Sequence, residues 1–126
     1  MGVGKPIVVI IEDDPASAEA LGFVLRDWGA EVVHGTDYES ISRTLGSRLH
    51  HVHAIIADFQ LGDGSDGVAL SQNLRRTARQ ARVLVLSGSF RGQAILAATL
   101  AGFEFLPKPT RAGDIITWLD RACVSP

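Results

Sequence analysis

The sequence has little that would point to secretion or to a membrane. Cys123 is its only cysteine, so no internal disulfide can form, and no basic, apolar signal segment opens it. Its longest apolar run, near residues 7–11, has the length of a strand rather than the roughly 20 residues that cross a bilayer. We therefore expect a soluble, cytoplasmic protein in a reducing setting, with no membrane as a direct partner.

An excess of charge of either sign is also lacking. Twelve lysines and arginines stand against fourteen aspartates and glutamates, which gives a formal net charge of -2. This balance offers no broad cationic surface to a phosphate backbone, so nucleic acid is not expected as a direct partner. The 126 residues fit one domain that needs no disulfide or structural metal. We expect it to span residues 6–123, between tails at 1–5 and 124–126.

Five short apolar runs, rich in β-branched residues, predict strands. They cover residues 7–11, 31–34, 54–57, 83–86 and, more weakly, 104–106. Helical patterns separate them, which gives the order βαβαβαβαβα. Strict alternation with nearly continuous apolar strands predicts an α/β fold, a doubly wound parallel sheet with helices on both faces.

Signals at both ends define the first expected helix. Asp14 is a suitable cap, Pro15 suits the first helical position, and Gly29 ends the helix, which therefore covers residues 15–28. Its apolar stripe consists of Leu21, Val24, Leu25 and Trp28.

The later helices follow from caps and from apolar spacing. Asp37 is expected to cap the second, and Ser65 or Asp66 the third, which continues to about Arg79. The fourth, over 91–101, is apolar around most of its circumference, so part of its surface is expected to meet a partner. The side chains expected inside the second, third and fifth helices are Tyr38, Ile41, Leu45, Leu70, Leu74, Ile115, Trp118, Leu119 and Ala122.

Polar residues follow four of the expected strands. In chain order these are Glu12, Asp13 and Asp14, then Asp58, then Ser87 and Gly88, then Lys108 between two prolines. In an open parallel sheet, ligands bind beyond the carboxyl ends of the strands, where the winding direction reverses. The acids converge there if the first and third strands are neighbours.

Such a cluster of acids requires protons or a cation. Two carboxylates about 4 Å apart repel by roughly 4 kcal/mol at an effective dielectric constant of 20. Ligation by oxygen alone suits Mg²⁺ or Mn²⁺, whereas zinc prefers His or Cys. The residues favour Glu12 and Asp13 as the metal pair, because Asp14 already has a capping role. A shift of one residue would make Asp13 and Asp14 the pair instead.

Two other motifs have ordinary structural explanations. His50, His51 and His53 are dense enough to suggest a metal site, but they precede a strand and lack a partner motif, so we expect a solvated polar loop. Gly62, Gly64 and Gly67 suggest a phosphate cradle, but Gly62-Asp63-Gly64 fits first a turn through which the chain leaves the third strand, so we expect all three glycines to be structural.

The order of motifs resembles the receiver domain of bacterial two-component response regulators over essentially the whole chain. The resemblance rests on VVIIEDDP at the first strand, IIADFQL at the third, VLVLSGS at the fourth and FLPKP at the fifth. It implies a flavodoxin-like (βα)5 sheet with strand order 2-1-3-4-5. It also implies that the protein is a regulatory phosphoacceptor in a phosphorelay and not an enzyme. Such a domain catalyses only its own phosphorylation and dephosphorylation.

The resemblance also implies a role for each site residue. Asp58 would accept a phosphoryl group from a phosphohistidine of a histidine kinase or histidine phosphotransfer domain. The implied ligands of Mg²⁺, or of Mn²⁺, are Glu12, Asp13, Asp58 and the main-chain carbonyl of Gln60. Ser87 would be the switch hydroxyl and Lys108 the phosphate contact, aimed at the site by a cis Lys108–Pro109 bond.

Three positions depart from commoner receiver patterns. Phe105 stands at the aromatic switch position, where Tyr is frequent, Gly62 replaces a common Pro, and Thr110 stands where Phe is usual. Phosphorylation would draw Ser87 and Lys108 inward and favour an inward Phe105. A downstream protein would then meet the changed face of the fourth helix, fifth strand and fifth helix, and homodimerisation stays open.

Several alternatives remain from the sequence. A pseudo-receiver would keep the fold as an unphosphorylated docking module. A phosphatase of the haloacid dehalogenase type also uses Asp and Mg²⁺, but its nucleophile ends the first strand in a D-x-D pattern, which Glu12, Asp13 and Asp14 do not form. The chain is either a free-standing regulator or the receiver of a hybrid sensor histidine kinase, and its motif style favours the latter.

Overall fold

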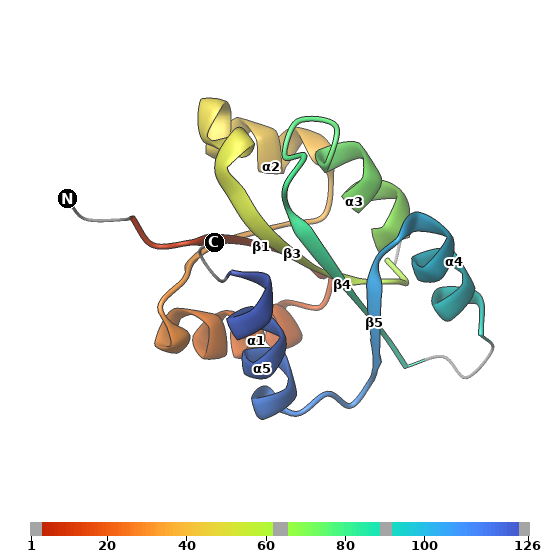
Figure 1. Ribbon diagram of the computed structural model, residues 1–126. Coiled ribbons are helices and arrows are strands. Elements are labelled where there is room, and N and C mark those ends of the chain that lie inside the picture. The colour runs from red at the N-terminus through yellow and green to blue at the C-terminus, as the bar shows by residue number, and fades with distance from the viewer. Residues whose placement is uncertain (1–3, 62–65, 89–91, 124–126) are drawn as a thin grey trace.

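Five parallel strands form the centre of the protein in the computed structural model, which describes residues 4–61, 66–88 and 92–123. The strands are β1 (Ile7–Ile11), β2 (Glu31–Gly35), β3 (Val52–Asp58), β4 (Arg82–Ser87) and β5 (Glu104–Pro107). Their order across the sheet is β2-β1-β3-β4-β5 (Figure 1). The predicted fold is confirmed, and β1 lies beside β3, as convergence of the acids requires.

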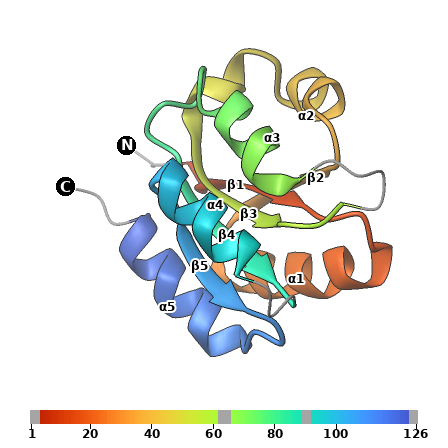
Figure 2. The same ribbon diagram turned by 90° about the vertical axis from the view of Figure 1, so that its right-hand side faces the viewer.

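Helices cover both faces of the sheet. α1 (Pro15–Trp28) and α5 (Ala112–Ala122) lie on one face, and α2 (Tyr38–Leu45), α3 (Gly67–Leu74) and α4 (Gln93–Ala101) on the other (Figures 1 and 2). A short 3₁₀ helix, η1 (Gly46–His51), leads from α2 into β3. In the part of the chain that the structure describes, no helix combines the length and apolar character needed to span a bilayer.

The strands are buried on both faces, which explains their nearly continuous apolar sequences. In β1, Val8 and Ile10 pack into the core cluster under α1 and α5, whereas Val9 and Ile11 pack into the cluster under α2, α3 and α4. No residue of β1 is more than 6% exposed. The sheet therefore has a core on each side, and β1 is packed on both faces up to its carboxyl end.

The predicted caps are found at three helices. Asp14, Asp37 and Asp66 each accept the main-chain N–H of the residue three positions later. Ser65, the alternative cap of α3, and the expected turn glycines Gly62 and Gly64 lie outside the described residues.

The third helix is shorter than predicted. It ends at Leu74 rather than near Arg79. The Arg75 guanidinium donates to the main-chain carbonyls of Ala81 and Arg79, each at 2.9 Å. Because a side chain satisfies these acceptors, the segment after Leu74 forms a tight turn without continuing the helix.

The histidine cluster is not the polar loop that we predicted. His50 and His51 belong to the 3₁₀ helix η1, and His53 lies inside β3. His53 Nδ1 accepts the main-chain N–H of Ile7 at 3.3 Å, next to an irregularity in the pairing of β1 with β3. The imidazole thus takes the place of a strand carbonyl, a structural role that periodicity alone does not reveal.

Candidate functional site

The register of the sheet places the predicted site residues at one edge. Ile11 pairs with Ala57, Asp58 with Leu86, and Ser87 with Pro107. Each strand therefore ends at nearly the same level. The residues at or just after these ends are Glu12, Asp13, Asp58, Ser87 and Lys108.

Three carboxylates meet at this edge. Glu12, Asp13 and Asp58 each place a carboxylate oxygen so that the three atoms lie within 4.8 Å of one another. Glu12 is buried, Asp58 is half-buried and Asp13 is exposed. Asp14 instead points its carboxylate at the start of α1, where it accepts the Ser17 N–H at 3.1 Å. Of the two registers left open by the sequence, this arrangement groups Glu12 and Asp13 with Asp58.

Lys108 approaches the same carboxylates from the end of β5. Its Nζ lies 3.3 Å from Asp58 Oδ2 and 3.4 Å from Glu12 Oε2. Its main-chain N–H donates to the Ser87 carbonyl at 2.9 Å, and the Lys108–Pro109 peptide bond is cis, as expected. One residue therefore connects the ends of β1, β3, β4 and β5.

The electrostatics of the cluster reflect its crowding. Burial raises the pKa of Glu12 above its ordinary value, and the neighbouring Asp58 carboxylate raises it further, against the lowering effects of the Asp14 N–H and Lys108. Burial lowers the pKa of Lys108, but the charges of Asp58 and Glu12 outweigh it, so the net shift is upward. Lys108 is therefore held as an ammonium, and Glu12 retains a proton more readily than an isolated glutamate.

The chain after β3 is positioned by close backbone contacts. The Gln60 N–H donates to Asp58 Oδ1 at 3.3 Å, and the Gly67 N–H donates to the Phe59 carbonyl at 3.0 Å. A Cβ at position 67 would lie 2.1 Å from the Asp58 carbonyl oxygen. Only glycine fits this position, so the start of α3 sits directly against the backbone of Asp58.

Two further predicted site residues, Ser87 and Phe105, lie on β4 and β5. Ser87 is 3% exposed at the last position of β4. Phe105, in β5, is half-buried and packs against the core cluster under α2, α3 and α4. The structure therefore holds Phe105 partly inward.

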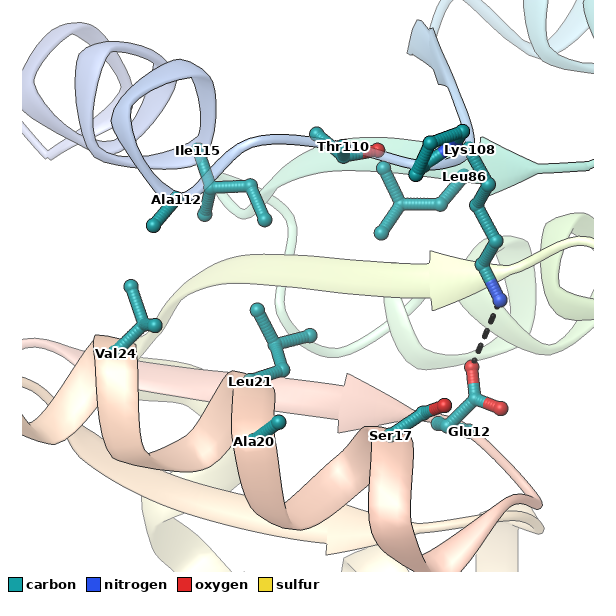
Figure 3. A pocket seen from close by; sticks show the side chains of 11 residues that line it. Glu12, Ser17, Ala20, Leu21, Val24, Leu86, Lys108, Thr110, Ala112 and Ile115 are labelled. Atoms are coloured by element: carbon teal, nitrogen blue, oxygen red, sulfur yellow. Dashed lines mark hydrogen bonds and ion pairs between the residues drawn. The ribbon is translucent and has the colours of Figure 1, made fainter.

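Sequence reasoning missed a groove beside the acids. It lies between α1 and α5, has a volume of about 530 Å³, and opens at one end onto Glu12 and Lys108 (Figure 3). Its walls are mostly apolar and include Leu21, Val24, Leu86 and Ile115. The small residues Ala20, Thr110 and Ala112 leave the space open, and Thr110 in place of the usual Phe was the signal for it.

A second contact was also missed. His34, near the end of β2, places its Nε2 in hydrogen-bonding contact with the main-chain carbonyl of Glu12. The signal available in the sequence was a histidine near the carboxyl end of a strand that neighbours β1. This contact ties the backbone of Glu12 to the adjacent strand.

The donor set fits a hard divalent cation. All the converging side-chain atoms are carboxylate oxygens, and Asp13 faces solvent, so an ion at this edge would keep part of its water shell. Within the described residues, no histidine or cysteine joins this cluster, which disfavours zinc.

Comparisons with known proteins agree on one fold. A receiver domain from Clostridium thermocellum has 22% sequence identity and a TM-score of 0.79, with 93% of both chains covered. A CheY-like receiver domain protein from Methanospirillum hungatei JF-1 has 16% identity and a TM-score of 0.78, over 94% of this chain and 93% of that one.

A response regulator from Burkholderia pseudomallei, solved with a phosphorylated aspartic acid, a calcium ion and citrate, has 24% identity and a TM-score of 0.77. The match covers 90% of this chain and 65% of that one. No significant match was found among curated proteins.

The family profile of the response regulator receiver domain matches residues 8–120. Receiver domains are regulatory phosphoacceptors of two-component signalling, bind Mg²⁺ at an acidic pocket, and interact with histidine kinases or phosphotransfer proteins and with effectors. The matched segment contains all the residues that meet at the acidic edge, from Glu12 to Lys108. The chain therefore belongs to the response regulator receiver domain family.

Proposed function

We propose that Asp58 is the phosphoacceptor of this receiver domain and that Mg²⁺ binds between Glu12, Asp13, Asp58 and the main-chain carbonyl of Gln60. One observation supports this most directly. The three carboxylate oxygens lie within 4.8 Å of one another, and the Lys108 ammonium is 3.3 Å from Asp58 Oδ2. The site thus combines a carboxylate nucleophile with fixed positive charge.

Phosphoryl transfer needs a positioned nucleophile and stabilisation of the oxygens of the transferred group more than it needs a base. An Asp58 oxygen attacks phosphorus in line, the bond from phosphorus to the donor histidine nitrogen breaks, and that nitrogen keeps the electron pair. Lys108 and the hydroxyl of Ser87 stabilise phosphoryl oxygens. A bound Mg²⁺ supplies further positive charge at the acidic cluster.

The groove between α1 and α5 is the approach that we propose for the phosphohistidine donor. It ends at Lys108 and Glu12, and apolar side chains such as Leu21 and Ile115 line it. An apolar helix face of a histidine kinase or phosphotransfer domain complements such a surface. The donor's side chain would then arrive beside Asp58.

The output surface that we propose consists of α4, β5 and α5. Ile95, Leu96 and Leu100 expose much of their side chains on α4. Closure of Ser87 and Lys108 on a phosphorylated Asp58 would free space for Phe105 and alter this surface. A downstream protein, or a second copy of the chain, would recognise the change.

The receiver unit that we propose covers residues 6–123, is cytoplasmic, and catalyses its own phosphorylation and dephosphorylation. Gln60, two residues beyond the acceptor, is exposed, so it is placed to influence the access of water to the phosphoryl group. We propose that the unit belongs to a hybrid sensor histidine kinase.

The test uses acetyl phosphate and Mg²⁺. We expect intact-mass analysis to detect one added phosphoryl group that is stable in acid and lost in base. Asp58→Asn should not gain it, whereas Asp27→Asn, an exposed change on α1, should behave as wild type. If wild type gains no such mass, or if Asp58→Asn gains it equally, Asp58 is not the acceptor.

The same samples distinguish the rival functions. A pseudo-receiver would stay unmodified while retaining its fold by circular dichroism. A phosphatase of the haloacid dehalogenase type would turn over a phosphate ester such as p-nitrophenyl phosphate with Mg²⁺, with its nucleophile at the end of β1 and not at Asp58.

A further inference from the structure

A second group of charged residues lies at the opposite edge of the sheet from the acids. Arg75, Arg76, Arg79 and Arg82 fall within one short segment and are four of the twelve lysines and arginines in the chain. The segment runs from the end of α3 to the start of β4, at the amino ends of β4 and β5 (Figure 1). Positive charge is thus concentrated locally, although the chain as a whole is slightly acidic.

Three of these arginines, Arg75, Arg79 and Arg82, border a cavity of about 450 Å³. The side chains and backbone that line it include Arg75, Arg79, Gln80, Arg82, Phe103 and Glu104. Three arginines and one glutamate give the lining a net formal charge of +2. A volume in this range suits a small organic ligand rather than a lone inorganic ion.

The wall of the cavity is held in place before any ligand binds. Arg75 donates to the carbonyls of Arg79 and Ala81, and its guanidinium carbon lies 5.8 Å from the centre of the Phe103 ring. These contacts fix the turn between α3 and β4 against the start of β5. Binding would therefore require little ordering of the backbone.

The arginines at the cavity differ in whether a carboxylate pairs with them. Arg82 forms an ion pair with Glu104 across the start of β4 and β5. Within the described residues, Arg79 and Arg76 form no ion pair, and both are exposed. Among the described residues, the charges of the lining that no carboxylate offsets are therefore those of Arg79 and Arg75, and Arg76 adds a third positive charge close by in sequence.

We propose that this cavity binds a small organic dianion, a phosphate monoester or an organophosphonate, with its charged group on Arg79 and its organic part beside Phe103. A dianion matches the lining charge of +2, and guanidinium groups bind phosphate oxygens in pairs. Asp58 and Lys108 lie at the carboxyl ends of the strands, so this site is separate from the phosphoacceptor site and does not depend on its assignment.

The test is an NMR titration of the full chain with phenylphosphonate, which has no transferable phosphoryl group, in the presence of Mg²⁺. We expect saturable shifts of the main-chain amides of residues 79–82 and 102–104. Arg79→Gln should weaken binding roughly tenfold, the loss expected for one charge-assisted hydrogen bond. Arg43→Gln, a matched change of an exposed arginine on α2, should leave it unchanged.

Two further ligands identify the chemistry. Inorganic phosphate should bind the same amides more weakly than phenylphosphonate, and equal binding would assign the site to free phosphate instead of an ester. A glutamate-rich peptide that bound more tightly than either would overturn the small-ligand proposal. Shifts confined to Asp58, Ser87 and Lys108, or equal binding by the Arg79 and Arg43 variants, would also overturn it.

Discussion

The ammonium nitrogen of Lys108 lies 3.3 Å from Asp58 Oδ2, so the end of β5 supplies a positive charge to the end of β3. The Lys108 side chain is 33% exposed, and an ion pair of this kind is screened by solvent. One ammonium therefore offsets only part of the repulsion between Glu12, Asp13 and Asp58. This imbalance determines how the domain should respond to Mg²⁺.

Asp13→Asn is expected to separate stability from metal binding. Without Mg²⁺, the change removes one of three clustered charges and should stabilise the fold by at most about 1 kcal/mol, because Asp13 is exposed. With Mg²⁺, the wild type should gain stability and the variant should gain much less. Thermal unfolding with and without Mg²⁺ measures both effects.

The matched control is Asp27→Asn, which removes an exposed carboxylate from α1. Its response to Mg²⁺ should equal that of the wild type. An Asp13→Asn variant that Mg²⁺ stabilises as strongly as the wild type would show that the ion does not bind at this cluster.

Mg²⁺ affinity should depend on pH through Glu12. Burial and the charge of Asp58 raise the pKa of Glu12 above 4.5, so a proton competes with the metal at a higher pH than for an ordinary glutamate. Affinity should therefore fall as the pH drops through that raised pKa. Lys108, whose pKa is raised above 10.5, stays charged throughout and contributes no titration in this range.

The raised pKa of Glu12 also affects how the stability of the fold without Mg²⁺ depends on pH. Because the folded state holds the Glu12 proton more tightly than the unfolded state, its contribution to stability is present below pH 4.5 and is lost as the pH rises through the raised value. Calorimetric titration of Mg²⁺ at several pH values, with NMR titration of the Glu12 carboxyl group, checks both statements. A Glu12 pKa at or below 4.5 would contradict them.

Gly67→Ala should damage the fold and the site together. The new Cβ would lie 2.1 Å from the Asp58 carbonyl oxygen and 3.0 Å from Ala57 Cβ, so the backbone of β3 or α3 must move. We expect a loss of about 2 kcal/mol or more in the free energy of unfolding. Urea denaturation measures it.

Gly113→Ala, at a second glycine within a helix, should stabilise the protein where Gly67→Ala destabilises it. A Cβ at position 113 would meet no atom within 4 Å, and the site is exposed near the start of α5. Alanine should therefore stabilise the protein by about 0.5 to 1 kcal/mol. Equal effects at the two positions would refute the steric explanation for Gly67.

Trp28 and Asp120 form a link between α1 and α5. The Trp28 indole N–H donates to Asp120 Oδ1 at 2.8 Å. A double-mutant cycle with Trp28→Phe and Asp120→Ala should give a coupling energy of about 1 kcal/mol. The cycle of Trp28→Phe with Asp114→Ala should give none, and a coupling near zero for the first pair would show that the bond contributes nothing.

The sheet and the acidic edge were predictable because they depend on patterns within short segments. Apolar runs fixed the strands, and the caps Asp14, Asp37 and Asp66 fixed three helix starts. The grouping of Glu12 and Asp13 with Asp58 then follows from strand order. That order came from the resemblance and not from periodicity.

The features that were not predicted depend on contacts between distant residues. Arg75 ends α3 by binding carbonyls beyond the helix, and His53 fills a gap in the pairing of β1 with β3. The groove between α1 and α5 exists because small side chains from both segments face each other across it. None of these is visible in the spacing of apolar residues along one segment.

The attachment of α4 has a dynamic consequence. Its fully buried side chains are Ala94 and Ala98, whereas the larger Ile95, Leu96 and Leu100 face outward. A methyl group buries little apolar area, at about 25 cal/mol per Å², so the contact of α4 with the sheet is energetically weak. Among the described helices, we therefore expect the amides of α4 to exchange with solvent most readily. We also expect a small change in free energy at the carboxyl edge of the sheet to be enough to move α4.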